Sequence, residues 1–297
     1  MTVAELPGKA MLAPMADFTE LPFRLLCRKY GADCSLVPLV SATAITRSES
    51  YFENIRVAEK ENAGLQLFGA APADFGIAVE RITDALPFVK WLDLNCGCPS
   101  PRTTAGGAGS RLLKKPKLAA AMVARMKRSG LRVSVKMRLL PKMEKTLEFC
   151  KAMEKAGADF LIVHGRTEKQ GYSGKADWDS IKKIRERTGI PVVGNGDINE
   201  IALGRKYVKE GYADAFMIGR AALSNPRIFC GKKTEGIEDA KGLLREYLAL
   251  CNRNDFLEVN NAKLVATQFF RGFRGSAGMR LAVSKAKSIE DIKVFMQ

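Results

Sequence analysis

Eight short apolar runs, each followed by an amphipathic stretch, recur through the first three-quarters of this chain. Each run has the length of a β-strand, and several are rich in Val, Ile or Phe. Several of the amphipathic stretches end at a glycine, as helices often do. We therefore expect strands over residues 10–15, 34–39, 65–69, 91–96, 133–138, 160–165, 191–196 and 215–220. We expect helices over residues 21–33, 72–86, 117–130, 146–159 and 178–189.

Eight strand–helix units over about 220 residues fit a TIM (β/α)8 barrel better than a doubly wound sheet. A doubly wound dinucleotide-binding fold carries G-x-G-x-x-G after its first strand, whereas the turn here reads PMADFTELP, without glycine. After Asn225-Pro226 the strand pattern stops, and from about Ile237 the pattern is helical only. The fold class we expect is α/β, a TIM barrel over residues 1–232 followed by a small all-helical domain over residues 233–297.

The cysteines and the single histidine limit the kinds of site that the chain can hold. Cys96 and Cys98 form the only C-x-C pair, and the other five cysteines lie far apart in the sequence. A structural zinc or iron–sulfur site usually takes four ligands in tight pairs, so no metal is expected. A disulfide framework is disfavoured because cysteine is sparse. A single reactive thiol is the alternative that these patterns leave in place.

Other features concern the location of the protein. The N-terminal segment MTVAELPGKAMLAP lacks the basic and then apolar regions of a secretory signal. No run reaches the ~18 apolar residues that a membrane span needs. We therefore expect a soluble, cytoplasmic protein, and we take a monomer as the starting expectation.

Positive charge is concentrated in one part of the chain. The formal net charge is +16, and the segment 111–145, called the basic band below, holds twelve basic residues against one acidic residue, Glu144. Solvated helix faces would explain most basic runs, but solubility does not require so one-sided a balance. Binding to a phosphate backbone does require an excess of positive charge, so the charge balance favours nucleic-acid binding.

Polar residues follow the predicted strands at their C-terminal ends, where the active sites of barrels form. The apolar pair Pro14-Met15 follows the first strand, and the polar residues are Gln66, Asn95 with Cys98, Lys136 with Arg138, His164 with Arg166, Asn195-Gly196-Asp197 and Gly219-Arg220. Carboxylates are nearly absent, which disfavours a metal hydrolase. The last two groups are glycine-containing turns where barrels commonly bind a phosphate. Lys136 and His164 are suited to an electron-rich ring, and Gln66 and Asn95 to hydrogen bonds at its edge.

Each of these residues also has an ordinary structural explanation. Gln66 can be a half-buried polar residue, Lys136 can neutralise Asp93, Asn195-Gly196 can be a tight turn, and His164 can be a hydrogen-bonded structural residue. Their joint placement at matching strand ends favours a functional site.

Several segments together resemble the tRNA dihydrouridine synthases. These segments are LAPMADFTELPFRLLCRKYGAD, LQLFGAAP, LDLNCGCPSP with GGAGSRLL, VKMR, HGRTEKQGYSGKADW, VVGNGDI and MIGRAALSNPRIF. The resemblance covers residues 10–229 and, more loosely, the tail. It departs from the family at Lys263-Leu264, where a basic residue followed by His is common. It implies an FMN-binding TIM barrel, a helical C-terminal domain, and reduction of the 5,6 double bond of uridines in tRNA.

The resemblance also implies a role for each candidate residue. Cys98 matches the cysteine that acts as general acid, with Cys96 as a neighbour. A free thiol, with an ordinary pKa of about 8.5, is mostly protonated at neutral pH and can donate a proton. FMN is expected to be surrounded by Pro14, Met15, Ala16, Gln66, Lys136, His164, Asn195, Gly196, Asp197, Gly219 and Arg220. The flipped uracil is expected to be held by Asn95, Arg138, Arg166 and Tyr172. NADPH or NADH would be the reductant, and the basic band and the tail would bind the tRNA phosphates.

Two other functions remain open from the residues alone. Another FMN barrel of the dihydroorotate-dehydrogenase type, acting on a free pyrimidine, would share the strand-end N-x-x-C-P and the phosphate turns. The size of the basic band and the helical tail argue against it. An RNA-binding barrel that no longer catalyses is the second possibility, and intact Cys98, Lys136 and His164 argue against that one.

Overall fold

Eight parallel strands form a closed barrel in the computed structural model, which describes residues 5–296. The strands are β1 Ala10–Leu12, β2 Cys34–Ser41, β3 Ala63–Phe68, β4 Trp91–Cys96, β5 Arg132–Leu139, β6 Phe160–Thr167, β7 Val192–Asn195 and β8 Ala215–Ile218. Neighbours in the chain pair in order, and β8 pairs with β1. All eight predicted strands are present, and the prediction of a TIM barrel is confirmed.

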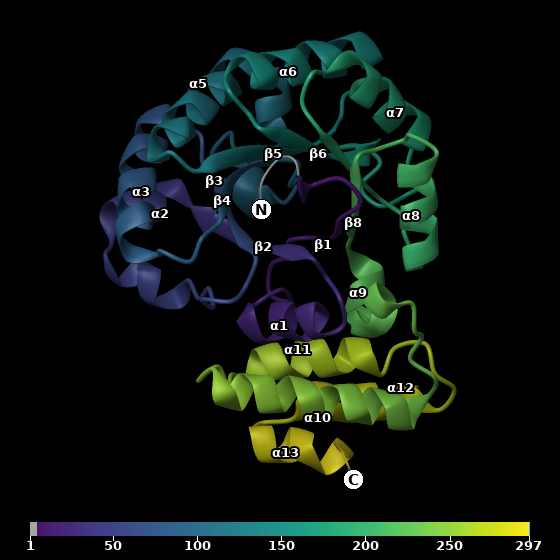
Figure 1. Ribbon diagram of the computed structural model, residues 1–297. Coiled ribbons are helices and arrows are strands. Elements are labelled where there is room, and N and C mark those ends of the chain that lie inside the picture. The colour runs from purple at the N-terminus through teal and green to yellow at the C-terminus, as the bar shows by residue number, and fades with distance from the viewer. Residues whose placement is uncertain (1–4, 297) are drawn as a thin grey trace.

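Helices cover the outside of the barrel (Figure 1). The α-helices of this part are α1 Leu21–Lys29, α2 Ala42–Arg47, α3 Pro72–Ala85, α4 Pro101–Thr104, α5 Pro116–Met126, α6 Met143–Lys155, α7 Trp178–Arg187, α8 Ile201–Lys209 and α9 Arg220–Ser224. Short 3-10 turns are η2 Ser50–Asn54, η3 Gly109–Lys114, η4 Lys127–Ser129 and η5 Pro226–Cys230. Helices α2, α4, α8 and α9 lie outside the helix ranges that we predicted. No helix within residues 5–296 is long and apolar enough to cross a membrane.

Side chains alternate between the two faces of the strands, as they must in a barrel. On β4, Leu92, Leu94 and Cys96 pack with the helices, whereas Trp91 packs with Phe160 in a separate inner cluster. The inner cluster also contains Leu6 and Met11 and fills one end of the barrel. The other inward positions of β4 are Asp93 and Asn95, so polar side chains occupy the interior toward the C-terminal ends of the strands.

Strand β1 is shorter than predicted. It ends at Leu12, whereas we expected it to reach residue 15. The proline at position 14 has no N–H to donate to a strand ladder, which explains an early end. The segment after β1 instead folds into a turn in which Thr19 Oγ1 accepts from the N–H of Met15 at 2.9 Å.

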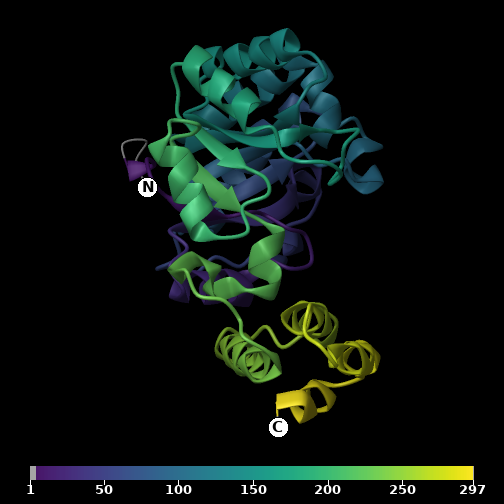
Figure 2. The same cartoon turned by 90° about the vertical axis from the view of Figure 1, so that its right-hand side faces the viewer.

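The chain after β8 is helical, as predicted, with α10 Ile237–Arg253, α11 Val259–Phe269, α12 Ser276–Lys285, α13 Ile289–Lys293 and η6 Val294–Met296. The helices pack beside α1 and α9 and extend to one side of the barrel (Figures 1 and 2). The domain boundary at residues 232/233 stays a prediction. Residues 1–4, part of the segment from which we inferred the lack of a secretory signal, lie outside the described residues.

Specific contacts join the tail to the barrel. Glu246 on α10 accepts from Lys29 Nζ and from the Tyr30 hydroxyl, both at 2.8 Å. On α11, Asn261 Nδ2 donates to the carbonyl of Asp17 at 2.8 Å, in the turn that follows β1. The tail therefore contacts a loop at the C-terminal end of the barrel, where the candidate site lies.

Candidate functional site

The predicted site residues of β3 to β7 lie side by side around the interior of the barrel. Strand register pairs Asn95 with Lys136, Arg138 with His164, and His164 with Asn195. Arg220 is the first residue of α9, and the remaining candidates lie in loops that follow the strands: Pro14, Met15, Ala16, Cys98, Tyr172, Gly196, Asp197 and Gly219. The fold thus brings the predicted set to one end of the barrel.

A chain of hydrogen bonds runs from the barrel interior to the loop that follows β4. The carboxyl group of Asp93 accepts from the Ser134 hydroxyl at 2.5 Å and from Gln66 Nε2 at 2.8 Å. Gln66 Oε1 accepts from Asn95 Nδ2 at 2.8 Å, and Asn95 Oδ1 accepts from the backbone N–H of Cys98 at 2.9 Å. The backbone N–H groups of Gly97 and Cys98 can only donate, so Asn95 turns its oxygen toward them and its Nδ2 toward Gln66 Oε1, which leaves Gln66 Nε2 to donate to Asp93. This series of hydrogen bonds holds the backbone at Cys98 in place.

Lys136 does not neutralise Asp93 by direct contact. Within residues 5–296 the two form no ion pair, and Lys136 Nζ instead donates to Asn195 Oδ1 at 3.3 Å. Burial lowers the pKa of Lys136 to about 8, with Asp93 opposing the shift and Arg138 adding to it. Burial raises the pKa of Asp93 to about 7, against the hydrogen bonds from Ser134 and Gln66. Burial thus disfavours the charged form of both groups.

The two cysteines of the C-x-C pair have different surroundings. Cys96 is fully buried among residues that face the helices, and burial raises the pKa of its thiol. Cys98 is partly exposed, and its Sγ accepts from the Thr103 hydroxyl at 3.4 Å. The carbonyl of Cys98 accepts from the N–H of Ser110 at 3.0 Å. Cys98 is therefore the accessible thiol, held in position on both sides.

Arg138 connects two loops at the mouth of the barrel. Its Nε donates to the carbonyl of Gly97 at 3.0 Å, and its Nη1 donates to the carbonyls of Thr167 and Gly171 at 3.1 and 2.8 Å. The side chain is only 4% exposed. Arg138 thus connects the loop of residues 97–100, called the Cys98 loop below, to the loop that follows β6.

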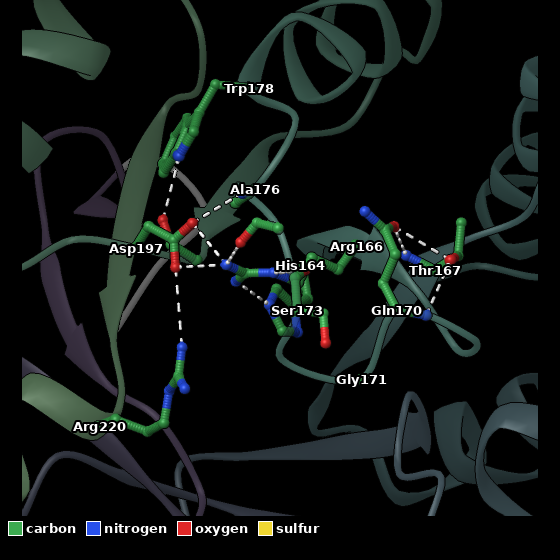
Figure 3. Close-up of polar contacts among 12 residues, drawn as sticks. His164, Arg166, Thr167, Gln170, Gly171, Ser173, Ala176, Trp178, Asp197 and Arg220 are labelled. Carbon is green, nitrogen blue, oxygen red and sulfur yellow. Dashed lines mark hydrogen bonds and ion pairs between the residues drawn. The ribbon is translucent and has the colours of Figure 1, made fainter.

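Arg166 is at the centre of a second group of contacts (Figure 3). Its Nη2 contacts both carboxylate oxygens of Asp197, at 2.7 and 2.6 Å, and the carbonyl of Gly174 at 2.6 Å. Its Nε donates to the carbonyl of Ser173 at 3.1 Å. Although partial burial opposes ionisation of Asp197, the hydrogen bonds from Arg166 and from the N–H of Ala176 lower the pKa of this carboxyl group. The guanidinium is 2% exposed and is used to hold the loop 167–176.

His164 is neutral in this setting. Burial, together with the charges of Lys136, Arg138, Arg166 and Arg220, lowers the pKa of the imidazole to about 2. Its Nε2 lies 3.3 Å from Arg166 Nη1, and a guanidinium can only donate. The ring proton is therefore assigned to Nδ1.

The turn that follows β7 has a geometry that depends on glycine. Gly196 has a φ of +125°, and a Cβ there would lie 2.6 Å from the Cβ of Ala176. Asp197 also has a positive φ, of 55°. Within residues 5–296, the amides of Gly196, Asp197, Gly219 and Arg220 donate to no acceptor. Two turns that are adjacent in the barrel therefore present free N–H groups, next to the exposed side chain of Arg220.

Tyr172 differs from the other predicted substrate-binding residues. Its side chain is 61% exposed, whereas Asn95, Arg138 and Arg166 are buried and make the hydrogen bonds to protein described above. The guanidinium carbons of Arg220 and Arg138 lie 4.3 and 5.7 Å from the centre of the Tyr172 ring. An aromatic face flanked by cations is suited to contact a planar base.

The members of the basic band do not all lie on one surface. Lys136 and Arg138 point into the barrel, and Lys127 and Lys145 form ion pairs with Asp159 and Glu148. The remaining members of the band are Arg111, Lys114, Lys115, Lys117, Arg125, Arg128, Arg132 and Lys142. Fewer than the twelve basic side chains of the band are therefore available to bind a polyanion such as RNA.

Three residues that complete the site were not assigned a role from sequence: Asp93, Ser134 and Thr103. Asp93 lies on the inward face of β4 with Asn95, and the alternation of side chains along a strand could have placed Asp93 in the site from the sequence alone. The pairing of Ser134 with Asp93 depends on strand register, and the contact of Thr103 depends on a loop. In the described part of the chain, no three His, Cys, Asp or Glu residues are placed to hold a metal ion.

Solved structures with related folds support the architecture. Histamine dehydrogenase from Rhizobium sp. 4-9 superposes with a TM-score of 0.56 at 13% identity, over 82% of this chain and 48% of that one. A 6-hydroxypseudooxynicotine amine oxidase from Pseudomonas geniculata N1 gives a TM-score of 0.57 at 12% identity, over 81% of this chain and 50% of that one. At this level of identity the likeness concerns the fold alone.

Sequence comparison identifies the family. A family model described as dihydrouridine synthase matches residues 11–267. A probable tRNA-dihydrouridine synthase of Aquifex aeolicus is 30% identical over 96% of this chain and 94% of its own length. A human protein named tRNA-dihydrouridine(20a/20b) synthase [NAD(P)+]-like is 31% identical over 74% of this chain and 70% of its own length. On these matches and on the closed barrel that carries the N-x-G-C-P loop, this chain belongs to the dihydrouridine synthase family.

Proposed function

We propose that this protein reduces the 5,6 double bond of uridines in tRNA to give dihydrouridine, with FMN as cofactor, NADPH or NADH as reductant and Cys98 as general acid. The observation that carries the proposal is the placement of Cys98. It is a partly exposed thiol at the C-terminal end of β4, held by Asn95 and Thr103 in a chain of this family.

The flavin phosphate and ring would lie at the C-terminal end of the barrel. The unpaired amides of the turns 195–197 and 219–220, with Arg220, would bind the phosphate. Lys136 and the neutral His164 would contact the ring system, as would Gln66, which retains one N–H beyond its bond to Asp93. Pro14, Met15, Ala16 and Asn195 complete the proposed set. Asp197 would contribute its backbone amide, because its carboxylate is paired with Arg166.

The four residues expected to hold uracil would have two different roles, contact with the base and positioning of the loops. Tyr172 has free surface for the base. Asn95, Arg138 and Arg166 position the Cys98 loop and the loop 167–176 through the contacts described above. The target uridine must leave its stack in the folded RNA to reach such a site, and an exposed aromatic face at the mouth would receive it.

The residues of the chain account for the proton that the reaction needs. When bound and reduced, FMN would supply the hydride that carbon 6 of uracil takes up. The Cys98 thiol donates its proton to carbon 5 and becomes a thiolate, which regains a proton from solvent. The Thr103 hydroxyl, which donates to Sγ, would stabilise that thiolate. Asn95 keeps the Cys98 backbone in place during the transfer.

The cofactor assignment is tested by releasing the non-covalently bound group from purified protein and determining its mass. We expect FMN, because the free amides and Arg220 provide one phosphate site at the barrel mouth. Recovery of FAD, or of no flavin after reconstitution with FMN, would contradict the assignment. Absence of any flavin would favour an RNA-binding barrel without catalytic activity.

A further inference from the structure

A basic pocket lies beside the Cys98 loop and is not explained by the flavin or uracil sites. It has a volume of about 500 Å³ and is formed by α4, by the turn that follows α4 and by η3. Its lining consists of Pro101, Thr104, Ala105, Gly107, Arg111, Lys114 and Lys115.

The charges that line this pocket have no counterions in the protein. Arg111, Lys114 and Lys115 are exposed, and within residues 5–296 none of them lies within ion-pair distance of a carboxylate. The lining itself contains no Asp or Glu. Three like charges around one concave surface repel one another, and a bound anion would relieve the repulsion. An arginine fork together with two lysines is a donor set suited to phosphate oxygens.

Both walls of the pocket are connected to the reacting thiol. Helix α4 begins at Pro101, and Thr103 within it donates to Cys98 Sγ at 3.4 Å. On the other wall, Ser110 of η3, next to Arg111, donates its N–H to the Cys98 carbonyl at 3.0 Å. Gly109 fits closely here, since a Cβ at this position would lie 2.5 Å from that carbonyl oxygen. An anion that bridges the two walls would therefore also stabilise the loop that carries Cys98.

We propose that this pocket binds one phosphate group during the reaction and thereby orders the Cys98 loop. The inference rests on the proposed function, which offers two sources of this phosphate group. One is a phosphodiester of the RNA strand next to the reacting uridine, and the other is the 2′-phosphate of NADPH.

The test compares two triple variants of the flavin-loaded protein. The pocket variant combines Arg111→Ala, Lys114→Ala and Lys115→Ala. The control combines Lys183→Ala, Arg205→Ala and Lys209→Ala, which removes the same charge from exposed positions on α7 and α8. The measurements are the affinity for unmodified tRNA at several salt concentrations, and the KM for flavin reduction by NADPH and by NADH without RNA.

If the phosphate comes from RNA, the pocket variant should bind tRNA about 10-fold more weakly than the control. The slope of log affinity against log salt should become less steep by about 1 for each lost phosphate contact. The KM for flavin reduction by NADPH should be unchanged. If it comes from the reductant, the KM for NADPH should rise while that for NADH stays constant. Agreement of the pocket variant with the control in all three measurements would overturn the inference. Failure of the unaltered protein to bind tRNA and to accept electrons would instead refute the proposed function.

Discussion

Replacing Cys98 by alanine should lower uridine reduction by about 10²–10⁴-fold, the range expected for loss of a positioned proton donor. Flavin content, flavin reduction by the nicotinamide cofactor and tRNA binding should stay close to those of the unaltered protein. Cys98 is bonded through its backbone to Asn95 and Ser110, and alanine retains both of those hydrogen bonds. The measurement is single-turnover reoxidation of reduced flavin by unmodified tRNA.

Cys96→Ala is the matched control for this experiment. The Cys96 side chain packs with residues that face the helices, away from the barrel interior. We expect turnover within a few-fold of normal, and a destabilisation of about 1 kcal/mol from lost packing. An inactive Cys96→Ala protein beside an active Cys98→Ala protein would reverse the assignment. If both variants remained active, the thiol would not be the acid.

Arg166→Met should destabilise the protein by about 3 kcal/mol, the lower end of the range for breaking a buried ion pair. The substitution leaves Asp197 and the carbonyls of Ser173 and Gly174 without their donor. The lower end applies because Asp197 is 34% exposed and water can partly replace the guanidinium. The measurement is denaturant unfolding of the flavin-loaded protein, together with its flavin content, which should fall as the turn 195–197 loosens.

Lys145→Met provides the comparison for Arg166→Met. Lys145 pairs with Glu148 on the surface of α6, where both side chains are more than half exposed. Loss of such a pair changes stability by about 0–1 kcal/mol. If Arg166→Met were no more destabilising than this control and only weakened tRNA binding, Arg166 would contact the substrate, as the family resemblance alone suggested.

Patterns that depend on local sequence predicted most of the fold. All eight strands appear because each is an apolar run of strand length bounded by turn residues. The helices that were missed are short or weakly patterned. Helices α2, α4 and α9 have only six, four and five residues, and α8 contains Gly204. That glycine is required by packing, since a Cβ there would lie 2.3 Å from the Phe216 ring.

The candidate site was predicted less completely than the fold. Strand ends placed Gln66, Asn95 and His164 together because the carboxyl ends of parallel strands meet at one end of a barrel. Which atoms each side chain uses depends on strand register and on loops. The sequence therefore did not show that Asn95 is bonded to the Cys98 backbone or that Arg166 is bonded to Asp197.

The most direct measurement is analysis of the nucleosides of an unmodified tRNA after incubation with the flavin-loaded protein and NADPH. If Cys98 and FMN act as proposed, specific uridines should gain two hydrogen atoms and appear as dihydrouridine, and the Cys98→Ala protein should give almost none. Unchanged uridine after incubation with a protein whose flavin is fully reduced by NADPH would contradict the proposed function.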